Sequence, residues 1–408
     1  MAQVSDRIPA RPSATAHPDR LPLPDVLRGV AILGTLMTNV WIFAAPAGEW
    51  GALTGATSGA TLNHLLDAPS PALAAETLFR LAADGKFLAM LTVLFGVGLA
   101  IQYDSARRRG LPWPRSYRPR AWFLLAEGTV HFVLVFAWDV LMAYALCSLL
   151  VSRLLVASDR VQRTVLRAAV AFHLVLMTAL SLLLALGDEV SATGEGPDAA
   201  AVDLYAHGSY LDQIAFRLAN TLALRIEPVL SFALLMALFL LGVRLFRAGA
   251  FAPGEEGRRL RSRLLAWGLG TGLPLSLASS LAGADGFLIQ RYVAAPALAL
   301  GYVGLVGVIL DRVARPPLTR SLTAVGRTAL SCYVGQNLLC MLACYGIGLG
   351  LAERLRDSGP WWVMGLWAAV SLILVLGARL WLHRFPTGPL ESVQRLLLRR
   401  PVPAAPRP

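Results

Sequence analysis

The sequence predicts an all-α protein: a polytopic bundle of membrane-spanning helices. Of its 408 residues, 56% are hydrophobic and only 15% are charged, whereas roughly 25% of the residues in an ordinary soluble domain are charged. The mean hydropathy is +0.58. Apolar segments long enough to cross a bilayer as helices recur along the chain. A soluble core of this size is therefore not expected, and the lipid bilayer is the predicted partner.

About ten apolar segments have the length of a membrane span. They cover residues 26–45, 87–103, 121–138, 140–156, 166–186, 229–246, 264–281, 292–310, 324–350 and 361–382. Only Trp138 and Asp139 separate the third from the fourth, which predicts a tight hairpin. Gly346, Gly348 and Gly350 predict that the ninth span bends or unwinds at its end.

Charge in the loops predicts the orientation of these spans. Arginines gather in alternate loops, at 107–120, 160–167, 244–263, 312–320 and 384–407, while the loop at 187–217 is acidic. Positive loops face the cytoplasm, so both termini are predicted to lie inside. Asp139 is then expected at the outer surface, with His131 about two helical turns below it. The net charge of +12 reflects these loops and predicts no nucleic-acid binding, because the arginines are not interleaved with aromatic residues.

The pattern divides the chain into five regions. Residues 1–24 are predicted to be a disordered cytoplasmic tail, since they lack the apolar core of a signal peptide. Residues 25–156 form an N-terminal membrane region with the candidate site, and 157–228 form a variable span and outer loop. Residues 229–395 form a C-terminal membrane region, followed by a cytoplasmic tail at 396–408.

Three ionisable residues interrupt the apolar stretch at 121–146. Glu127 precedes His131 by four residues, and Asp139 follows it by eight. On a continuous helix all three lie near one face. Ionisable side chains are costly in hydrocarbon and mark functional sites there. Glu127, His131 and Asp139 are therefore the candidate catalytic residues.

Further polar residues mark candidate binding positions. Asn39 follows Arg28 by eleven residues, close to three helical turns, so both lie on one face of the first span. Asp25 is an expected N-cap or a partner for Arg28. Lys86, at the mouth of the second span, is the one lysine in the sequence, which favours a role for a compact, titratable amine.

The later spans add polar residues of their own. Arg327 and Gln336 lie at the start of the ninth span, where Gln336 can hydrogen-bond a ligand or join helices. His173 has no acidic residue within one turn, which favours a hydrogen bond to a neighbouring helix. Of the four cysteines, Cys332, Cys340 and Cys344 share a helical stripe. No His or acidic residue accompanies them, so we expect helix packing and no metal site.

Several motifs together resemble a known family. They are Asp25-Val-Leu-Arg28-Gly with Asn39, Gly85-Lys86-Phe87 with Leu94-Phe95-Gly96-Val97-Gly98, His131 with Asp139 and Tyr144-Ala145-Leu146, Gly326-Arg327-Thr328-Ala329-Leu330 with Tyr333 and Gln336, and Phe385 with Gly388-Pro389-Leu390-Glu391. In this order they resemble the YeiB-like family of bacterial inner-membrane proteins. Residues 157–228 carry no such motif.

That family is similar to the transmembrane acyltransferase superfamily. The resemblance implies a multi-pass protein of the bacterial plasma membrane that transfers an acyl group from a cytoplasmic donor to a hydroxyl or amine. Acyl-CoA is the implied co-substrate, a small molecule or glycan is the acceptor, and no tightly bound cofactor is expected. Many of those enzymes pair the first-span arginine with a histidine eleven residues later. Asn39 occupies that position here, so the base must come from elsewhere, and His131 is the first candidate.

The resulting hypothesis is metal-free acyl transfer. His131 acts as general base or transient acyl carrier, and Glu127 or Asp139 orients its imidazole. Asn39 or Gln336 stabilises the developing oxyanion.

Arg28, Lys86 and Arg327 are predicted to bind the phosphates or carboxylate of the donor. The predicted topology places Arg28 and Arg327 at the inner end but Lys86 and Asp139 at the outer end, so a substrate path across the bilayer would be required.

Two alternatives use the same residues. A transporter or flippase for a small anionic or amphipathic metabolite would relay protons through Glu127, His131 and Asp139 and bind substrate at Arg28. The absence of a visible inverted repeat counts against a standard secondary transporter. In a non-catalytic scaffold, the polar residues would only join helices. The sequence sets no oligomeric state.

Overall fold

The computed structural model describes residues 22–53, 61–187, 198–312 and 316–398, and the regular structure within these ranges is helical, without strands. The predicted all-α class is confirmed. The helix α1 (Pro22–Ala44) begins inside the region predicted as a tail. The rest of that tail, residues 1–21, and the C-terminal residues 399–408 lie outside the described residues.

Each predicted span overlaps a long helix. Besides α1, these are α5 (Lys86–Arg108), α6 (Arg118–Leu134), α7 (Leu141–Leu154), α8 (Asp159–Gly187), α13 (Phe232–Arg247), α14 (Glu255–Leu281), α16 (Ala295–Arg312), α18 (Ala329–Cys344) and α20 (Trp361–Arg384). Among the described residues, six helical segments are long and apolar enough to cross a membrane. The helices α6, α7, α13 and α18 have 17, 14, 16 and 16 residues, fewer than the ~20 that a span requires. The count of ten spans stays a prediction.

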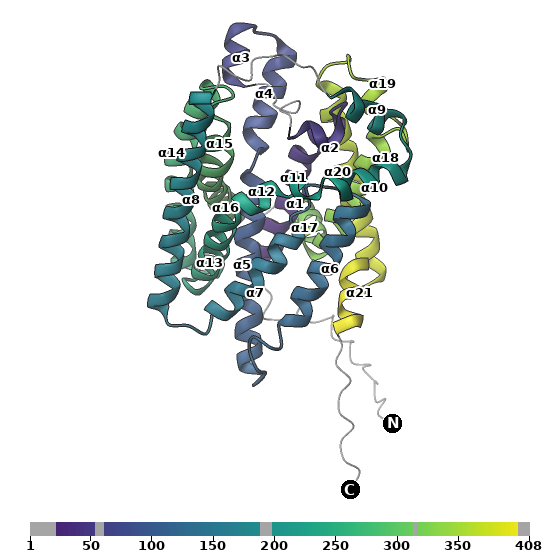
Figure 1. The fold of residues 1–408 in the computed structure, drawn as a ribbon. Coiled ribbons are helices and arrows are strands. Elements are labelled where there is room, and N and C mark those ends of the chain that lie inside the picture. The colour runs from purple at the N-terminus through teal and green to yellow at the C-terminus, as the bar shows by residue number, and fades with distance from the viewer. Residues whose placement is uncertain (1–21, 54–60, 188–197, 313–315, 399–408) are drawn as a thin grey trace, which may run out of the picture.

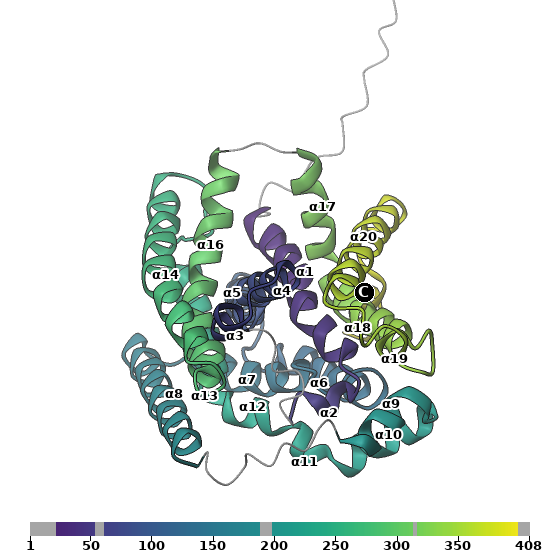
Figure 2. The ribbon, with the colours of Figure 1, turned by 90° about the horizontal axis from the view of Figure 1, so that it is seen from above.

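The bundle has a buried centre and an apolar outside. In the most hydrophobic part of α1, and in that of the segment Pro71–Arg108 which includes α5, 67% of the residues are buried, against 11% in α8 and 28% in α14 and α20. Figure 2 shows α8 and α14 at the periphery and α1 and α5 inside. Phe172, Val175 and Leu183 on α8 are 61%, 69% and 66% exposed. Such a surface suits lipid and not water, so the chain is a membrane protein.

Short turns at one end of the bundle join α5 to α6, α7 to α8 and α13 to α14. The same end carries the start of α1 and the helix α21 (Pro389–Leu398) (Figure 1). We call it the terminal end. The opposite, distal end carries α2 (Gly48–Gly51), α3 (Leu62–Asp67), α4 (Pro71–Ala83) and α19 (Leu351–Arg354).

The segment 199–230 crosses the bundle above α6 and α7. It comprises α9 (Ala199–His207), α10 (Tyr210–Ala219), α11 (Thr221–Leu224) and α12 (Ile226–Leu230) (Figure 1). The short helices α15 (Phe287–Ile289) and η1 (Gln290–Ala294) lead into α16. His173 on α8 hydrogen-bonds the carbonyl of Tyr292 on η1 at 3.0 Å, so the predicted interhelical bond is confirmed.

The predicted ninth span is divided. Its first residues end α17 (Pro316–Arg327), and α18 begins after Thr328. The carboxylate of Glu391 on α21 caps α18, because it accepts the backbone N–H of Leu330 at 2.8 Å and the hydroxyl of Ser331 at 2.6 Å. The predicted unwinding is confirmed: α18 ends at Cys344, and the chain bends through Gly350 at φ +63°.

Candidate functional site

A buried pair formed by His131 and Asp139 is the centre of the site. The helix α6 ends at Leu134, and residues 135–140 fold back before α7 begins at Leu141. This turn brings the Asp139 carboxylate to 2.9 Å from His131 Nδ1, with side-chain exposures of 0% and 1%. The prediction that Asp139 lies at an outer surface, two turns above His131, is therefore wrong. The chain leaves the helix before residue 139 and returns Asp139 to the level of His131.

The second oxygen of Asp139 caps α7. It accepts the backbone N–H groups of Leu141 at 2.9 Å and Met142 at 3.3 Å. The absence of a side chain at Gly128 lets the start of α7 and the Asp139 carboxylate approach α6 this closely, since a Cβ there would lie 2.7 Å from Met142 N and 3.0 Å from Asp139 Oδ2. An ionised carboxylate only accepts hydrogen bonds, so this geometry suits the neutral tautomer of His131 with its proton on Nδ1 and a lone pair on Nε2.

Asn337 on α18 faces this lone pair. Its Nδ2 lies 3.4 Å from His131 Nε2, and its Oδ1 accepts a 3.0 Å hydrogen bond from Asn39 on α1. The ring of Tyr333 packs 5.4 Å from the imidazole. Three helices thus meet at the histidine, and Asn337 is a site residue that the prediction did not include. The sequence did offer one indication of Asn337: it is a second amide side chain, next to Gln336, in an otherwise apolar span.

Two predicted residues lie near the pair without hydrogen-bonding it. Gln336 donates to Thr35 Oγ1 on α1 at 3.3 Å. Glu127 lies one turn from His131 toward the terminal end, and both of its carboxyl oxygens are buried and accept no hydrogen bond from the described residues. Of the two acids predicted to orient His131, the geometry selects Asp139.

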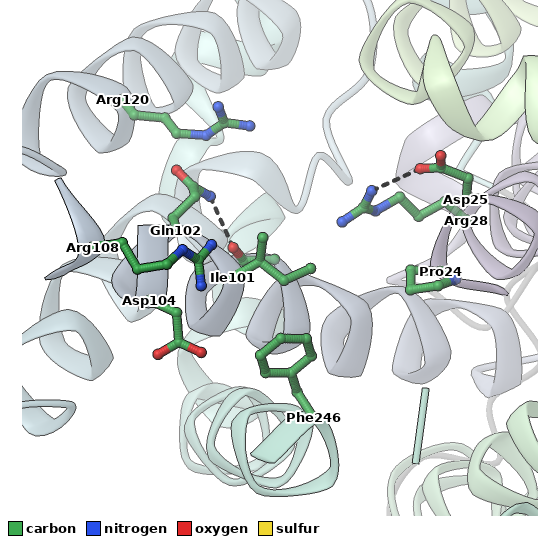
Figure 3. A pocket seen from close by; sticks show the side chains of 10 residues that line it. Pro24, Asp25, Arg28, Ile101, Gln102, Asp104, Arg108, Arg120 and Phe246 are labelled. Atoms are coloured by element: carbon green, nitrogen blue, oxygen red, sulfur yellow. Dashed lines mark hydrogen bonds and ion pairs between the residues drawn. The ribbon is translucent and has the colours of Figure 1, made fainter. Parts of the chain in front are cut away.

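A cavity rich in arginine opens at the terminal end. It has two adjoining chambers of about 720 and 300 Å³, which share Asp25, Arg28, Gly98, Gln102 and Arg120 as lining residues. We call it the arginine cavity. Its charged lining comprises five arginines and three acids: Arg28, Arg108, Arg120, Arg327, Arg395, Asp25, Asp104 and Glu391. Figure 3 shows Arg28 and Arg120 facing the same space from opposite sides.

The structure brings the predicted Arg28 and Arg327 together in the inner chamber. Asp25 lies in the first turn of α1 and is not its N-cap, and it pairs with Arg28 at 3.2 Å. The prediction did not include Arg108, Arg120 and Arg395. Arg120 precedes His131 by eleven residues, as Arg28 precedes Asn39, and this spacing was an available signal. Each pair lies on one helix face, about 16 Å apart along the axis.

The inner chamber ends about two helical turns from the histidine. Leu124 and Leu330 line it. Leu124 precedes His131 by seven residues, so about 10 Å of helix rise separates them. Leu330 precedes Tyr333, which packs on the imidazole, by one turn. Glu127 lies between Leu124 and His131 on α6, so its buried carboxyl group occupies the interval between cavity and histidine.

Known proteins resemble this sequence over nearly its whole length. The chain is 32% identical over 395 residues to "Uncharacterized protein YeiB" of Escherichia coli (strain K12), covering 92% of this chain and 95% of that protein. The chain belongs to the YeiB-like family. It is also 26% identical over 391 residues to "Uncharacterized protein YxaH" of Bacillus subtilis (strain 168), covering 92% and 94%. Residues 245–401 match the family model described as Protein of unknown function (DUF418).

Lys86 lies apart from the other predicted binding residues of this YeiB-like protein. It begins α5, is completely buried, and its Nζ makes no hydrogen bond to the described residues. Gly98, which faces Arg28, follows it by twelve residues, about 18 Å of helix rise. A single compact site containing Lys86, Arg28 and Arg327 is therefore not formed.

In the part of this family member that the structure describes, no three His, Cys, Asp or Glu residues are grouped closely enough to hold a metal ion. All four cysteines are buried free thiols.

Proposed function

We propose that this YeiB-like protein is a membrane-embedded acyltransferase of the bacterial plasma membrane. It moves an acyl group from a cytoplasmic donor such as acyl-CoA to a hydroxyl or amine of a small molecule or glycan. The observation that supports this most directly is the His131–Asp139 pair, buried in an apolar bundle and about two helical turns from the arginine cavity.

In this mechanism His131 acts as general base. Nε2 takes the proton of the acceptor O–H or N–H while the acceptor oxygen or nitrogen attacks the thioester carbonyl. Asp139 holds the tautomer and stabilises the imidazolium. As the tetrahedral intermediate collapses, the C–S bond breaks and the imidazolium returns the proton to the thiolate. The contact of 3.4 Å between Asn337 and Nε2 is long for a hydrogen bond, so an acceptor hydroxyl can displace it.

Amide groups beside the histidine suit the charge that develops on the carbonyl oxygen. Asn337 and Asn39 are fixed to one another at 3.0 Å, and a preorganised amide N–H directed at an oxyanion lowers the barrier. Asn337 thus joins Asn39 in the role that was predicted for Asn39 or Gln336.

The arginine cavity supplies the donor site. Guanidinium groups bind phosphates with two parallel hydrogen bonds. Arg108, Arg120 and Arg395 make no hydrogen bond or ion pair to the described residues through their side chains, so their donors are available to a ligand. The inner chamber is apolar on the side of Leu91, Leu94 and Phe95. An acyl thioester can therefore extend from bound phosphates toward His131.

Labelled acetyl-CoA, with purified protein in nanodiscs and a panel of hydroxyl and amine acceptors, tests the proposal. We expect transfer of label by the wild type and none by His131→Gln. His207→Gln is a matched control, because exposed His207 makes a similar 3.0 Å contact with Asp203. The proposal would be refuted if His131→Gln transferred label as fast as the wild type, or if the wild type transferred no label to any acceptor of the panel.

Transport of a small anionic or amphipathic metabolite is the second candidate. A second cavity of about 190 Å³, bordered by Asp84, Glu227 and Arg291, lies on the distal side of the bundle. Charged cavities on both sides of a buried histidine are also what a proton-coupled transporter or flippase needs. Uptake of an unmodified solute into proteoliposomes, without acyl transfer, would establish this alternative.

A further inference from the structure

A fully buried ion pair contacts the stretch of chain that joins His131 to Asp139. Glu49 on α2 and Arg217 on α10 are both 0% exposed, and Arg217 Nε lies 2.9 Å from Glu49 Oε2. The hydroxyl of Tyr205 also donates to Glu49 Oε2, at 3.2 Å. Glu49 lies in the connection between α1 and α5, and Arg217 lies in the segment 199–230. No pattern in the sequence indicates that these two connections are neighbours.

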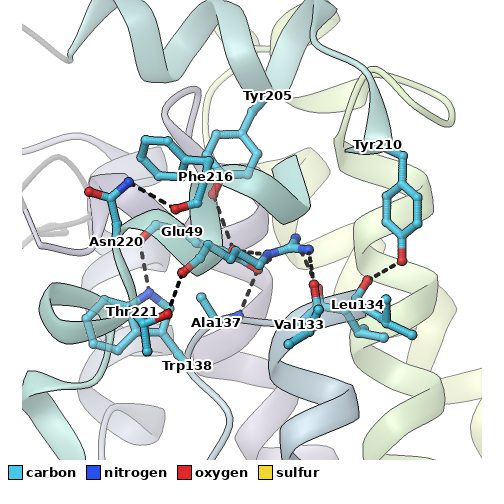
Figure 4. Close-up of polar contacts among 12 residues, drawn as sticks. Glu49, Val133, Leu134, Ala137, Trp138, Tyr205, Tyr210, Phe216, Asn220 and Thr221 are labelled. Carbon is cyan, nitrogen blue, oxygen red and sulfur yellow. Dashed lines mark hydrogen bonds and ion pairs between the residues drawn. The ribbon is translucent and has the colours of Figure 1, made fainter. Parts of the chain in front are cut away.

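Both members of this pair contact the turn at 135–140. Glu49 Oε1 accepts the N–H of Ala137 at 3.1 Å, and its backbone carbonyl accepts the indole N–H of Trp138 at 2.9 Å (Figure 4). Arg217 donates to the carbonyl of Val133, in the last turn of α6, at 3.2 Å, and makes a long contact of 3.5 Å with the carbonyl of Val135 in the turn. The turn is therefore held from both directions, by an acceptor for its N–H and by donors for its carbonyls.

These contacts fall where α6 would otherwise leave polar groups unsatisfied. The last carbonyls of a helix have no partner within the helix, and a cation is favourable there. The segment 199–230 supplies donors for them: Tyr210 bonds the carbonyl of Leu134 at 2.7 Å, and Arg217 bonds that of Val133. Within the turn, Arg225 bonds the carbonyl of Asp139. Arg225 also lies 4.1 Å over the ring of Phe132.

A buried ion pair is an inefficient way to stabilise a fold, because desolvation offsets most of its attraction. Its contacts here indicate a geometric role instead. The turn decides where the Asp139 carboxylate lies, and a displacement of about 1 Å at a catalytic group is enough to cost 10²-fold in rate.

We propose that Arg217, fixed by Glu49, is a positioning residue that holds the turn at 135–140 and thereby keeps the Asp139 carboxylate on His131 Nδ1. This inference rests on the proposed function for its activity readout only. The tautomer of His131 is measurable whether or not the protein transfers acyl groups.

The experiment uses full-length protein labelled with ¹⁵N-histidine in nanodiscs. The ring-nitrogen shifts of His131, assigned with His131→Gln, report whether Nδ1 or Nε2 carries the proton. The variants are Arg217→Met, Arg217→Lys and the double variant Glu49→Gln/Arg217→Met, which leaves no uncompensated charge. Arg261→Met is the matched control, since buried Arg261 likewise binds one carboxylate, of Asp311, and two backbone carbonyls, far from the site.

We expect wild type and Arg261→Met to show the Nδ1–H tautomer and Arg217→Met to lose it. The double variant should recover thermal stability but not the tautomer, because the carbonyls of Val133 and Val135 still lack donors. Arg217→Lys should show a partial loss of the Nδ1–H tautomer, since lysine keeps the positive charge but lacks the planar guanidinium group that bonds several acceptors at once. In the transfer assay, Arg217→Met should lower kcat by about 10²-fold and leave the KM for acetyl-CoA unchanged, because the arginine cavity is untouched.

Two results would overturn the positioning role: an unchanged tautomer in Arg217→Met, or recovery of the Nδ1–H tautomer in the double variant. The latter would show that Arg217 merely neutralises Glu49. A tautomer change in Arg217→Met, with no acyl transfer by the wild type, would support the positioning role and refute the proposed reaction.

Discussion

Replacing Asp139 by asparagine exchanges one acceptor oxygen for an NH₂ group at nearly constant size. The wild-type carboxylate accepts from His131 Nδ1 on one oxygen and from the N–H groups of Leu141 and Met142 on the other. Those two backbone donors require an oxygen, so the introduced amide would turn its NH₂ group toward His131. Nδ1 must then accept, the proton moves to Nε2, and Nε2 can no longer act as a base.

We expect Asp139→Asn to slow acyl transfer by about 10⁴-fold, as a wrong tautomer does in a catalytic triad, or roughly 5.5 kcal/mol of barrier. Stability should fall less, by about 1 kcal/mol, because the hydrogen bond between His131 and a charged carboxylate is replaced by a weaker bond to a neutral amide, while both backbone donors keep an acceptor. Initial rates at saturating labelled acetyl-CoA in nanodiscs measure the first effect, and thermal unfolding measures the second.

Asp203→Asn is the matched control for Asp139→Asn, because Asp203 makes a similar contact with His207 on the exposed surface. It should leave the rate unchanged. A folded Asp139→Asn protein that works within tenfold of the wild type would show that the buried pair is not the catalytic base.

The arginine cavity, the close approach at Gly128 and the cap on α18 can each be tested by one substitution. Arg120→Met should raise the KM for the acyl-CoA donor about tenfold or more with little change in kcat, whereas Arg109→Met, outside the cavity lining, should not; equal KM values would exclude Arg120 from donor binding. Gly128→Ala should reduce both activity and melting temperature, because its Cβ would lie 2.7 Å from Met142 N, and a wild-type melting curve would contradict this close packing. Glu391→Gln should lower the free energy of unfolding by about 1 kcal/mol through a weakened cap on α18, and an unchanged denaturation midpoint would show that this cap adds no stability.

The bundle was predictable because hydrocarbon requires long apolar helices, and these are visible in any window of the sequence. His131 and Asp139 stood out for the same reason: charge is conspicuous in an apolar stretch. Their relative depth was not predictable. Residues 132–138 are all apolar, so nothing in them marks the end of α6 at Leu134. That end depends on donors from Tyr210 and Arg217, which lie 76 and 84 residues from the carbonyls they bind.

The arginine cavity was only partly predictable. Arg28 and Arg327 stood inside recognisable motifs, whereas Arg108, Arg120 and Arg395 lie among many loop arginines that orient the chain in the membrane. Arginines that orient the chain and arginines that line the cavity look alike in a sequence, and only the packed structure distinguishes them. Glu49 gave no signal at all, because a single acid in a loop is ordinary until its partner 168 residues away is known.

The cap that Glu391 places on α18 has a consequence for how the protein is made. Residues of α1, α5, α6, α17, α18 and α21 line the inner chamber. The walls from the early helices are therefore completed only by α21, which is translated much later. The proposed donor site is therefore assembled only at the end of synthesis, and chains stalled before Pro389 should insert fully yet fail to bind an acyl donor.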